Sequence, residues 1–236
     1  MPAIAPRVLA HRGANQRARE NSVEAFALAA ELGAHGVELD ARRAADGIVV
    51  VHDAWIGGLG VPAEFTVAQI QAADPMVATL DAALDASRGM LVNVEIKNFP
   101  GDADFDLDER IVDAVVELLH GRGRRDDVLV SCFSLDSLTR VRALDPTLPT
   151  GFLTLLGFDP IEAVAVAAGH GHSALHPDLR SLPGPVAAAT AARCHEQDLQ
   201  MNVWTVNDPA DLRRLAVAGV DAVITDVPDV AREVFG

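Results

Sequence analysis

Short apolar runs rich in β-branched residues alternate with alanine-rich helical stretches along the whole chain, and this alternation is the strongest constraint on its fold. Such a pattern is typical of a parallel sheet covered by helices. The runs predict eight principal strands. They are Val8–Ala10, Gly36–Ala41, Leu91–Ile96, Val128–Cys132, Gly151–Leu155, Ser173–Leu175, Asn202–Val206 and Ala222–Thr225.

The stretches between these strands begin, in several cases, with Ser, Asp or Pro, which are common at helix starts. Ile48–His52 is an additional strand, because the Asp-Gly of "AADG" before it indicates a hairpin. Eight β/α units in 236 residues, without a glycine-rich dinucleotide loop, favour a closed barrel over an open doubly wound sheet. We therefore predict an α/β fold, with residues 1–236 forming a single-domain (β/α)8 TIM barrel that has an extra hairpin strand after its second strand. The predicted helices are Ser22–Leu32, Thr79–Ala86, Asp108–His120, Ser134–Leu144, Pro160–Ala168, Pro185–Asp198, Pro209–Ala218 and Pro228–Val234.

The charge balance limits the classes of partner. The net charge of −15, with no run of five or six Lys or Arg, argues against nucleic acid and against an anionic membrane surface. Two cysteines, Cys132 and Cys194, are too few for a disulfide framework and lack zinc-site spacing. The chain lacks a signal-peptide pattern and an apolar stretch long enough to cross a membrane, so we expect a cytoplasmic protein. Composition leaves open whether it forms a homo-oligomer.

The segment "GDADFDLDER" resembles a calcium loop only in part. Asp102, Asp104 and Asp106 alternate, but an EF-hand loop then needs Gly and Glu where this chain has Leu107 and Asp113. We expect instead a solvated acidic helix start, which the helix dipole favours.

Three carboxylates on two neighbouring barrel strands indicate a cation site. Residues two apart in a strand point to the same side, so Glu38 and Asp40 project together. Two parallel carboxylates in an apolar setting need a shared proton or cation. With Glu95 from the next strand, the ligands suit Mg²⁺ or Ca²⁺. The alternative is that Glu38 and Asp40 form salt bridges with Arg42, Arg43 or a neighbouring Lys.

Two histidines accompany these carboxylates. His11, Arg12 and Gly13 end the first strand, where Gly permits a tight turn and Arg offers a fork for a phosphate oxygen. His52 closes the hairpin strand beside Asp53, and two histidines near a metal would form an acid and base pair. The remaining histidines are expected to be structural or exposed, with "HGH" able to bind a metal adventitiously. They are His35, His120, His170, His172, His176 and His195.

Several motifs together resemble the glycerophosphodiester phosphodiesterase family, in its usual order and over nearly the whole chain. They are "AHRG", "ENSVEAFALAAELGAHGVELDARRAADGIVVVHD", "VNVEIK", "SCFSLDSL" and "NVWTVND". The resemblance implies a (β/α)8 barrel and a metal-dependent phosphodiester hydrolase with one divalent cation, Mg²⁺ or Ca²⁺. The site residues that it implies are Glu38, Asp40 and Glu95 for the cation, His11 and His52 for catalysis, and Arg12 and Lys97 for the phosphate.

The resemblance also assigns supporting residues. Glu20 occupies the first position of the family's "ENT" motif, although Asn21 and Ser22 follow it here, and it is expected to lie close to the metal and to orient the site. Asp53 is a further supporting residue. Trp204 in "NVWTVN" is expected to wall the pocket for the glycerol or alcohol part of the substrate. The alternative role of Trp204 is ordinary packing within the barrel.

The expected reaction neutralises the phosphodiester charge, deprotonates an attacking oxygen and protonates the leaving alkoxide. Water or a neighbouring substrate hydroxyl could attack. The chain departs from the family after Asp53, where "AWIGGLGVPAEFTVAQI" replaces a longer loop beside the substrate mouth. This change leaves the headgroup preference open, while the scarcity of aromatic residues favours a small polar phosphodiester over a lipid or a nucleobase.

The family resemblance predicts that glycerophosphodiesters, such as glycerophosphocholine or glycerophosphoethanolamine, are cleaved to sn-glycerol 3-phosphate and an alcohol. One alternative is a different phosphodiester, such as a lysophospholipid, cleaved at the same site. Another is a catalytically silent binding barrel, and a third is an isomerase or enolase-type enzyme that uses Lys97 as base. The presence of both His11 and His52 favours the hydrolase.

Overall fold

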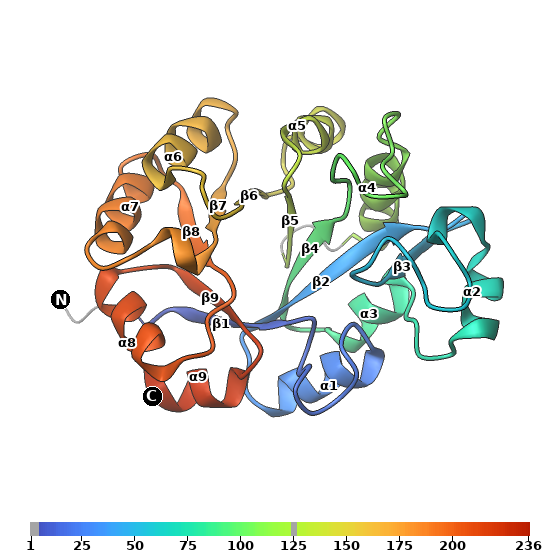
Figure 1. Ribbon diagram of the computed structural model, residues 1–236, viewed down its shortest axis with the longest axis horizontal. Helices are drawn as coiled ribbons and strands as arrows, with labels where there is room; N and C mark the ends of the chain where they lie inside the picture. The colour runs from blue at the N-terminus through green and yellow to red at the C-terminus, as the bar shows by residue number, and fades with distance from the viewer. Residues whose placement is uncertain (1–4, 124–126) are drawn as a thin grey trace.

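Eight parallel strands close into a barrel with helices around its outside (Figure 1), in a computed structural model that describes residues 5–123 and 127–236. Around the ring the strands follow the order β1, β9, β8, β7, β6, β5, β4 and β2, and β1 also pairs with β2. The barrel prediction is therefore confirmed. The strands are β1 (Arg7–His11), β2 (Gly36–Arg43), β3 (Ile48–Val50), β4 (Leu91–Ile96), β5 (Val128–Cys132), β6 (Thr150–Thr154), β7 (Ala174–Pro177), β8 (Gln200–Val203) and β9 (Ala222–Thr225).

Most of the described helices start at a short polar side chain that caps them. Ser22 accepts the backbone N–H of Ala25, and Ser134 accepts that of Ser137. Such caps satisfy amides that have no partner within the helix. The helices of the described residues are α1 (Val23–Glu31), α2 (Val67–Ala73), α3 (Leu80–Ala86), α4 (Arg110–Arg122), α5 (Leu135–Leu144), α6 (Pro160–Gly169), α7 (Val186–His195), α8 (Pro209–Ala218) and α9 (Pro228–Phe235), with 3₁₀ turns η1 (Pro62–Glu64) and η2 (Leu179–Ser181).

The core consists of the barrel strands and the helix faces that cover them. Nearly every residue of β4, β5 and β6 is buried, as expected for strands with side chains packed on both faces. This burial explains why apolar residues dominate these strands in the sequence, although Asn93 and Glu95 alternate with apolar residues in β4.

The extra strand β3 pairs antiparallel with β2 outside the ring, as the hairpin signal predicts. It ends at Val50, so His52 lies in the loop that follows and not in the strand. The sequence reading missed α2, which begins within the segment treated as a loop and extends past its end. Thr66 and Gln69 form a capping box at its start, but its short apolar pattern is weak and follows a Gly-rich and Pro-containing stretch.

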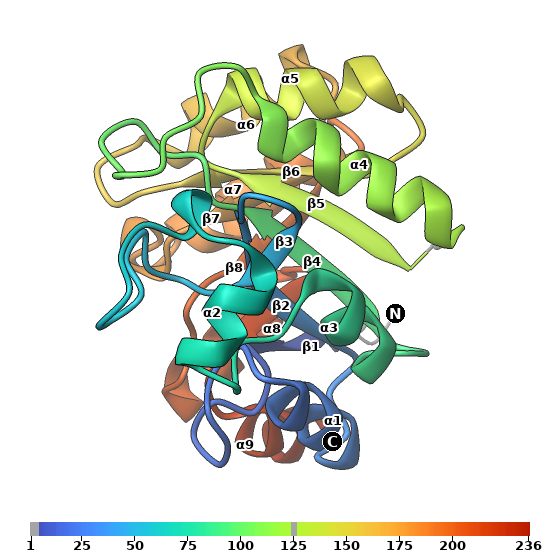
Figure 2. The same ribbon diagram turned by 90° about the vertical axis from the view of Figure 1, so that its right-hand side faces the viewer.

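The acidic segment "GDADFDLDER" is not a solvated helix start, so that prediction is wrong. The helix α4 begins only at Arg110, and Asp102 and Asp104 both form ion pairs with the buried Arg42. The local sequence could not reveal this pairing, because Arg42 lies on another strand. Figure 2 shows that the segment after β4, which holds these aspartates, projects on the same side of the barrel as the loop after β3.

Among the described residues, the helices are all too short or too polar to cross a bilayer.

A buried histidine makes the fold sensitive to acid. His176 on β7 is fully buried, and the side-chain amide of Asn202 donates to its Nε2 at 3.0 Å. Burial lowers the pKa of His176 to about 3, against about 6.5 in an unfolded chain. Between these values the unfolded state binds more protons, so stability falls as pH decreases through that window, by at most about 1.4 kcal/mol per pH unit.

We therefore expect that His176→Leu lowers the dependence of the unfolding free energy on pH between pH 6.5 and pH 4, whatever its effect at neutral pH. Urea denaturation of the metal-free protein at several pH values measures this slope. The control is His195→Ala, because His195 is exposed. Equal slopes for the wild type and His176→Leu would show that His176 is not the source of the acid sensitivity.

Candidate active site

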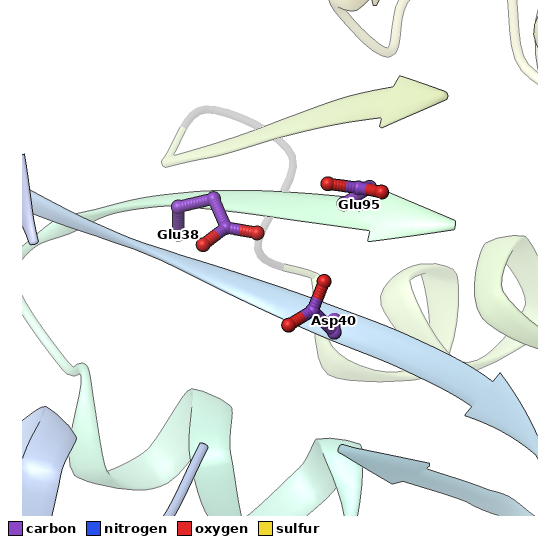
Figure 3. A group of neighbouring side chains, drawn as sticks. All are labelled: Glu38, Asp40 and Glu95. Carbon is purple, nitrogen blue, oxygen red and sulfur yellow. The ribbon is translucent and has the colours of Figure 1, made fainter. Parts of the chain in front are cut away.

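Three carboxylates meet where β2 and β4 lie side by side (Figure 3). In the register of the two strands Asp40 lies opposite Glu95, and Glu38 precedes Asp40 by two residues on the same side. One oxygen from each of the three carboxylates lies within 4.8 Å of the others, and all three residues are buried. The predicted convergence of Glu38, Asp40 and Glu95 is thus present in the structure.

The basic residues beside the cluster do not neutralise its three carboxylates equally. Burial and the neighbouring charge of Asp40 raise the pKa of Glu38 to about 8. Burial also acts to raise the pKa of Asp40, but Lys97 and Arg12 outweigh it and hold that pKa below its usual range. Lys97 Nζ lies 2.7 Å from Glu95 and 3.3 Å from Asp40, and Arg12 Nε lies 3.2 Å from Asp40. Glu38 is therefore the carboxylate whose charge is least compensated.

The residues present fit a divalent cation. Glu38 Oε1 is buried and has no hydrogen-bond partner among the described residues. A buried carboxylate oxygen without a partner is costly, and a bound cation would offset that cost. The three oxygen ligands are the type that Mg²⁺ and Ca²⁺ prefer. Of the alternative salt bridges, those of Glu38 or Asp40 to Arg42 or Arg43 are not present among the described residues, whereas Asp40 does pair with Lys97.

His11 is held by an aspartate that the sequence reading missed. Its Nδ1 lies 2.6 Å from Asp226, and its Nε2 lies 4.0 Å from Glu38. Asp226 follows β9, which pairs with β1, and the side chains of Asn15 and Asn207 donate to it. Burial acts to raise the pKa of Asp226, but the hydrogen bond and charge of His11 and the hydrogen bonds from Asn15 and Asn207 together outweigh it and lower that pKa to about 2. Since an ionised carboxylate only accepts, His11 donates from Nδ1 and directs Nε2 to the cluster.

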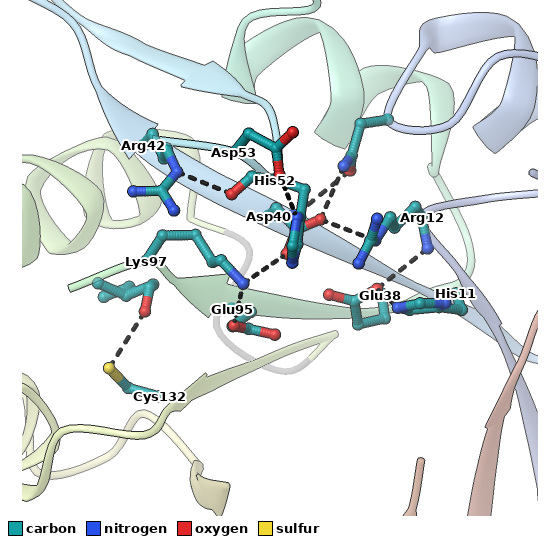
Figure 4. Close-up of polar contacts among 12 residues, drawn as sticks. His11, Arg12, Glu38, Asp40, Arg42, His52, Asp53, Glu95, Lys97 and Cys132 are labelled. Atoms are coloured by element: carbon teal, nitrogen blue, oxygen red, sulfur yellow. Dashed lines mark hydrogen bonds and ion pairs between the residues drawn. The ribbon is translucent and has the colours of Figure 1, made fainter. Parts of the chain in front are cut away.

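His52 approaches the cluster from the loop after β3 (Figure 4), and its Nδ1 lies 2.8 Å from the exposed carboxylate of Asp53. Its Nε2 is left for the site, as in His11. Burial by itself acts to lower the pKa of His11, whereas Asp226 and Glu38 raise it, and the net pKa lies above its usual value. Both predicted histidines thus have an aspartate at Nδ1.

Arg12 connects the carboxylates with a second acidic residue. Besides Asp40, its side chain contacts Glu20 at 3.0 Å, and its backbone N–H donates to Glu38 at 3.0 Å. Glu20 is half exposed and touches Arg12, not the three-carboxylate cluster. The sequence reading also missed Asn21, whose side-chain amide donates to Asp40 at 2.7 Å. Its place directly after Glu20 in the quoted motif was the available signal.

Two hollows share His52 and Asp53 in their lining. The polar hollow, of about 300 Å³, is bordered by Glu20, Asn21 and Trp55. The apolar hollow, of about 250 Å³, is bordered by Glu95, Lys97, Phe99, Phe133 and Leu155, together with the segment after β4.

Trp204 packs edge-on against Phe133 at 5.7 Å, and Phe133 packs edge-on against Phe99 at 5.9 Å. Trp204 does not border the apolar hollow directly, but it packs against Phe133, which does. Its indole N–H donates to the carbonyl oxygen of His176. The tryptophan therefore combines packing with support of the hollow, and the row of three rings provides more aromatic surface than the composition suggests.

The other histidines have structural partners or exposed positions, which agrees with the sequence reading. His120 contacts Asp145 and His195 contacts Asp221. His172 contacts Thr150 and stacks against His170, so the "HGH" motif is not part of a cluster of three metal-ligating side chains among the described residues. The cysteines are buried and free.

The family model of the glycerophosphoryl diester phosphodiesterase family matches residues 11–230. The chain belongs to this family. The glycerophosphodiester phosphodiesterase of Caldanaerobacter subterraneus subsp. tengcongensis is 30% identical to it over 244 residues, covering 94% of each chain. The family resemblance of the motifs is therefore confirmed, and the chain is a phosphodiesterase of this class.

Solved structures agree with the barrel. The glycerophosphodiester phosphodiesterase of Thermotoga maritima superposes with a TM-score of 0.82 at 28% identity and covers 98% of both chains. A phosphodiesterase of Oleispira antarctica, solved in complex with the product sn-glycerol-3-phosphate, has a TM-score of 0.82 at 23% identity, covering 98% of this chain and 96% of its own. The second comparison supports the fold.

Proposed function

We propose that this member of the family hydrolyses small glycerophosphodiesters, such as glycerophosphocholine and glycerophosphoethanolamine, to sn-glycerol 3-phosphate and an alcohol. The observation that carries the proposal is the convergence of the three-carboxylate cluster with two imidazoles at one end of the barrel. Mg²⁺ or Ca²⁺ is the proposed cation. The family membership supports the reaction class.

Glu38, Asp40 and Glu95 hold the cation in this proposal. When bound, it supplies Lewis-acid stabilisation of the charge that develops on the phosphoryl oxygens. Arg12 and Lys97 border the cluster with buried positive charge, and they bind the non-bridging oxygens of the phosphodiester through charge-assisted hydrogen bonds. Glu20 orients the Arg12 guanidinium.

His11 and His52 carry the proton transfers. Each has Nδ1 engaged by an aspartate, so each offers Nε2 to the reacting atoms. One imidazole removes the proton from the attacking oxygen, which belongs to water or to a neighbouring substrate hydroxyl. The other donates a proton to the leaving alkoxide, and each such step contributes about 10² to 10⁴ in rate.

The apolar hollow favours one further candidate substrate. Phe99, Phe133 and Leu155 line it next to Lys97 and Glu95, so an apolar substituent could lie beside a phosphate bound at the cluster. A lysophospholipid has this combination of groups. It is the second candidate substrate for the same chemistry.

A substrate panel tests the proposal. The purified protein, stripped of metal and resupplied with Mg²⁺, Ca²⁺ or Mn²⁺, is incubated with glycerophosphocholine, glycerophosphoethanolamine or a lysophospholipid, and the products are identified. We expect metal-dependent release of glycerol 3-phosphate that is lost in His11→Ala and kept in His170→Ala, since His170 is exposed and away from the carboxylates. Cleavage of an aryl phosphodiester without any glycerol 3-phosphate would reject the substrate assignment, and inactivity on every substrate would favour a binding protein.

Asp226 gives a more specific prediction. Replacing it by Asn keeps the size of the side chain but removes the charge that fixes the His11 tautomer. We expect kcat to fall by about 10²-fold, as for a misplaced catalytic group, with little change in the affinity for the cation. The control is Asp229→Asn, because Asp229 forms its ion pair with the exposed Arg17. An unchanged kcat in Asp226→Asn would exclude a role for this aspartate.

A further inference from the structure

Arg42 is a buried arginine on β2 that bonds to two separate segments at the mouth of the barrel. Its side chain is 3% exposed. Nε donates to the carbonyl oxygen of His52 at 2.9 Å. The two terminal nitrogens lie 2.8 Å from Asp102 and 2.5 Å from Asp104. All three nitrogens of the guanidinium are therefore engaged, and Figure 4 shows the contact to His52.

The first segment contains His52. The antiparallel pairing of β3 with β2 ends at Val50, and Val51 N–H still donates to the carbonyl oxygen of Asp40. From there the chain is irregular as far as the 3₁₀ turn at Pro62. The His52 imidazole has an exposed aspartate as its partner, Asp53, whose carboxylate is 80% exposed. The contact from Arg42 is therefore a buried anchor for the backbone of a residue whose side chain is weakly held.

The second segment follows β4 and contains Asp102 and Asp104. Asp104 is nearly as buried as Arg42, with 4% of its side chain exposed. Asp102, together with Phe99, borders the apolar hollow, and so does Arg42 itself. One guanidinium thus ties the backbone of His52 to the wall of the hollow beside the three-carboxylate cluster.

We propose that Arg42 is a positioning residue that fixes His52 against the reacting phosphate and couples the His52 turn to the segment that walls the apolar hollow. The inference rests on the proposed function, in which His52 transfers a proton. Arginine suits this task because its planar fork donates to three acceptors in fixed directions, whereas the ammonium of a lysine is a single point. A buried cation with two carboxylate partners is also rigid, because loss of either contact leaves a desolvated charge.

We expect substitutions of Arg42 to lower turnover and to leave the affinity for the metal cation nearly unchanged. We expect that Arg42→Lys and Arg42→Gln lower kcat by about 10²-fold, the cost of a misplaced catalytic group. The affinity for Ca²⁺ alone, measured by calorimetry without substrate, should stay within about threefold of the wild type, because Arg42 does not contact Glu38, Asp40 or Glu95. Asp102→Asn keeps the buried Arg42–Asp104 pair and is expected to cause a smaller loss of kcat.

The decisive comparison is a double-mutant cycle with His52→Ala. If Arg42 acts through His52, Arg42→Gln will change the residual rate of His52→Ala by less than about twofold, since coupled residues are not additive. Arg140→Gln is the matched control, because it removes an exposed Arg–Asp pair between α4 and α5. Cooperative thermal unfolding of each variant is measured alongside. Hydrogen exchange of the amides in 51–57 and 99–105 should quicken together in Arg42→Lys and remain unchanged in Arg140→Gln.

The outcomes distinguish a failure of the proposed role of His52 from a failure of the inference about Arg42. If His52→Ala retains wild-type activity, the proposed function of His52 fails, and the inference about Arg42 fails with it. If His52→Ala is impaired and Arg42→Gln lowers the rate equally in both backgrounds, Arg42 has only a structural role and the positioning inference is overturned. The same holds if Arg42→Lys folds cooperatively and turns over at the wild-type rate.

Discussion

Glu38→Gln is expected to lower kcat/KM by about 10³-fold and to abolish detectable binding of Ca²⁺ in calorimetry. The amide has the shape of the carboxyl group but lacks the charge that a cation requires. If the cation supplies about 4 kcal/mol to the transition state, its loss corresponds to roughly 10³ in rate. Glu31→Gln is the matched control, because Glu31 is exposed at the end of α1.

Although Glu38→Gln is expected to lose activity, it is expected to increase the stability of the metal-free protein. Because the pKa of Glu38 is raised to about 8 in the folded protein, against about 4.3 in an unfolded chain, the folded state binds the proton more tightly. The free energy of unfolding of the metal-free wild type therefore falls as pH rises from about 4.3 to 8, by at most about 1.4 kcal/mol per unit. Removing the charge eliminates this cost.

Metal-free Glu38→Gln should consequently have a higher thermal midpoint than the metal-free wild type at pH 8, and this difference should shrink toward pH 5. Added Ca²⁺ should raise the midpoint of the wild type and leave that of the variant unchanged, since a ligand stabilises only the state that binds it. A Ca²⁺-dependent midpoint in Glu38→Gln would contradict the assignment of Glu38 as a ligand.

The barrel and the acidic cluster could be predicted from the sequence because both depend on local spacing. Strands with two buried faces are predominantly apolar, and β4, β5 and β9 have the predicted bounds. Glu38 and Asp40 are two residues apart on one strand, so their common direction follows from strand geometry. Only the register that places Asp40 opposite Glu95 had to come from the structure.

The missed residues depend on contacts that closure of the barrel creates. Asp226 is 215 residues from His11 in sequence, and the two meet because the last strand pairs with the first. Arg42 was considered as a partner of Glu38 and Asp40, but its guanidinium reaches the segment after β4, where Asp102 and Asp104 lie. Spacing along a strand gives the direction of a side chain, whereas its partner across a loop depends on the path of that loop.

Replacing either His11 or His52 by Ala is expected to lower kcat on glycerophosphocholine by about 10² to 10⁴-fold, the usual contribution of a general acid or base. Both imidazoles have Nδ1 engaged by an aspartate and Nε2 available, so geometry alone does not separate their roles. The leaving group does. An alkoxide needs a proton as it departs, whereas the phenolate released from an aryl phosphodiester is stable without one.

We therefore expect the two variants to differ when the substrate is changed from glycerophosphocholine to an aryl phosphodiester. The variant that has lost the general acid should recover much of its rate on the aryl substrate, and the variant that has lost the general base should stay impaired on both. Steady-state kinetics of His11→Ala and His52→Ala on the two substrates, beside His170→Ala as a control, measures this difference. Wild-type rates for either variant on both substrates would remove that histidine from the mechanism, and the other would then have to transfer both protons.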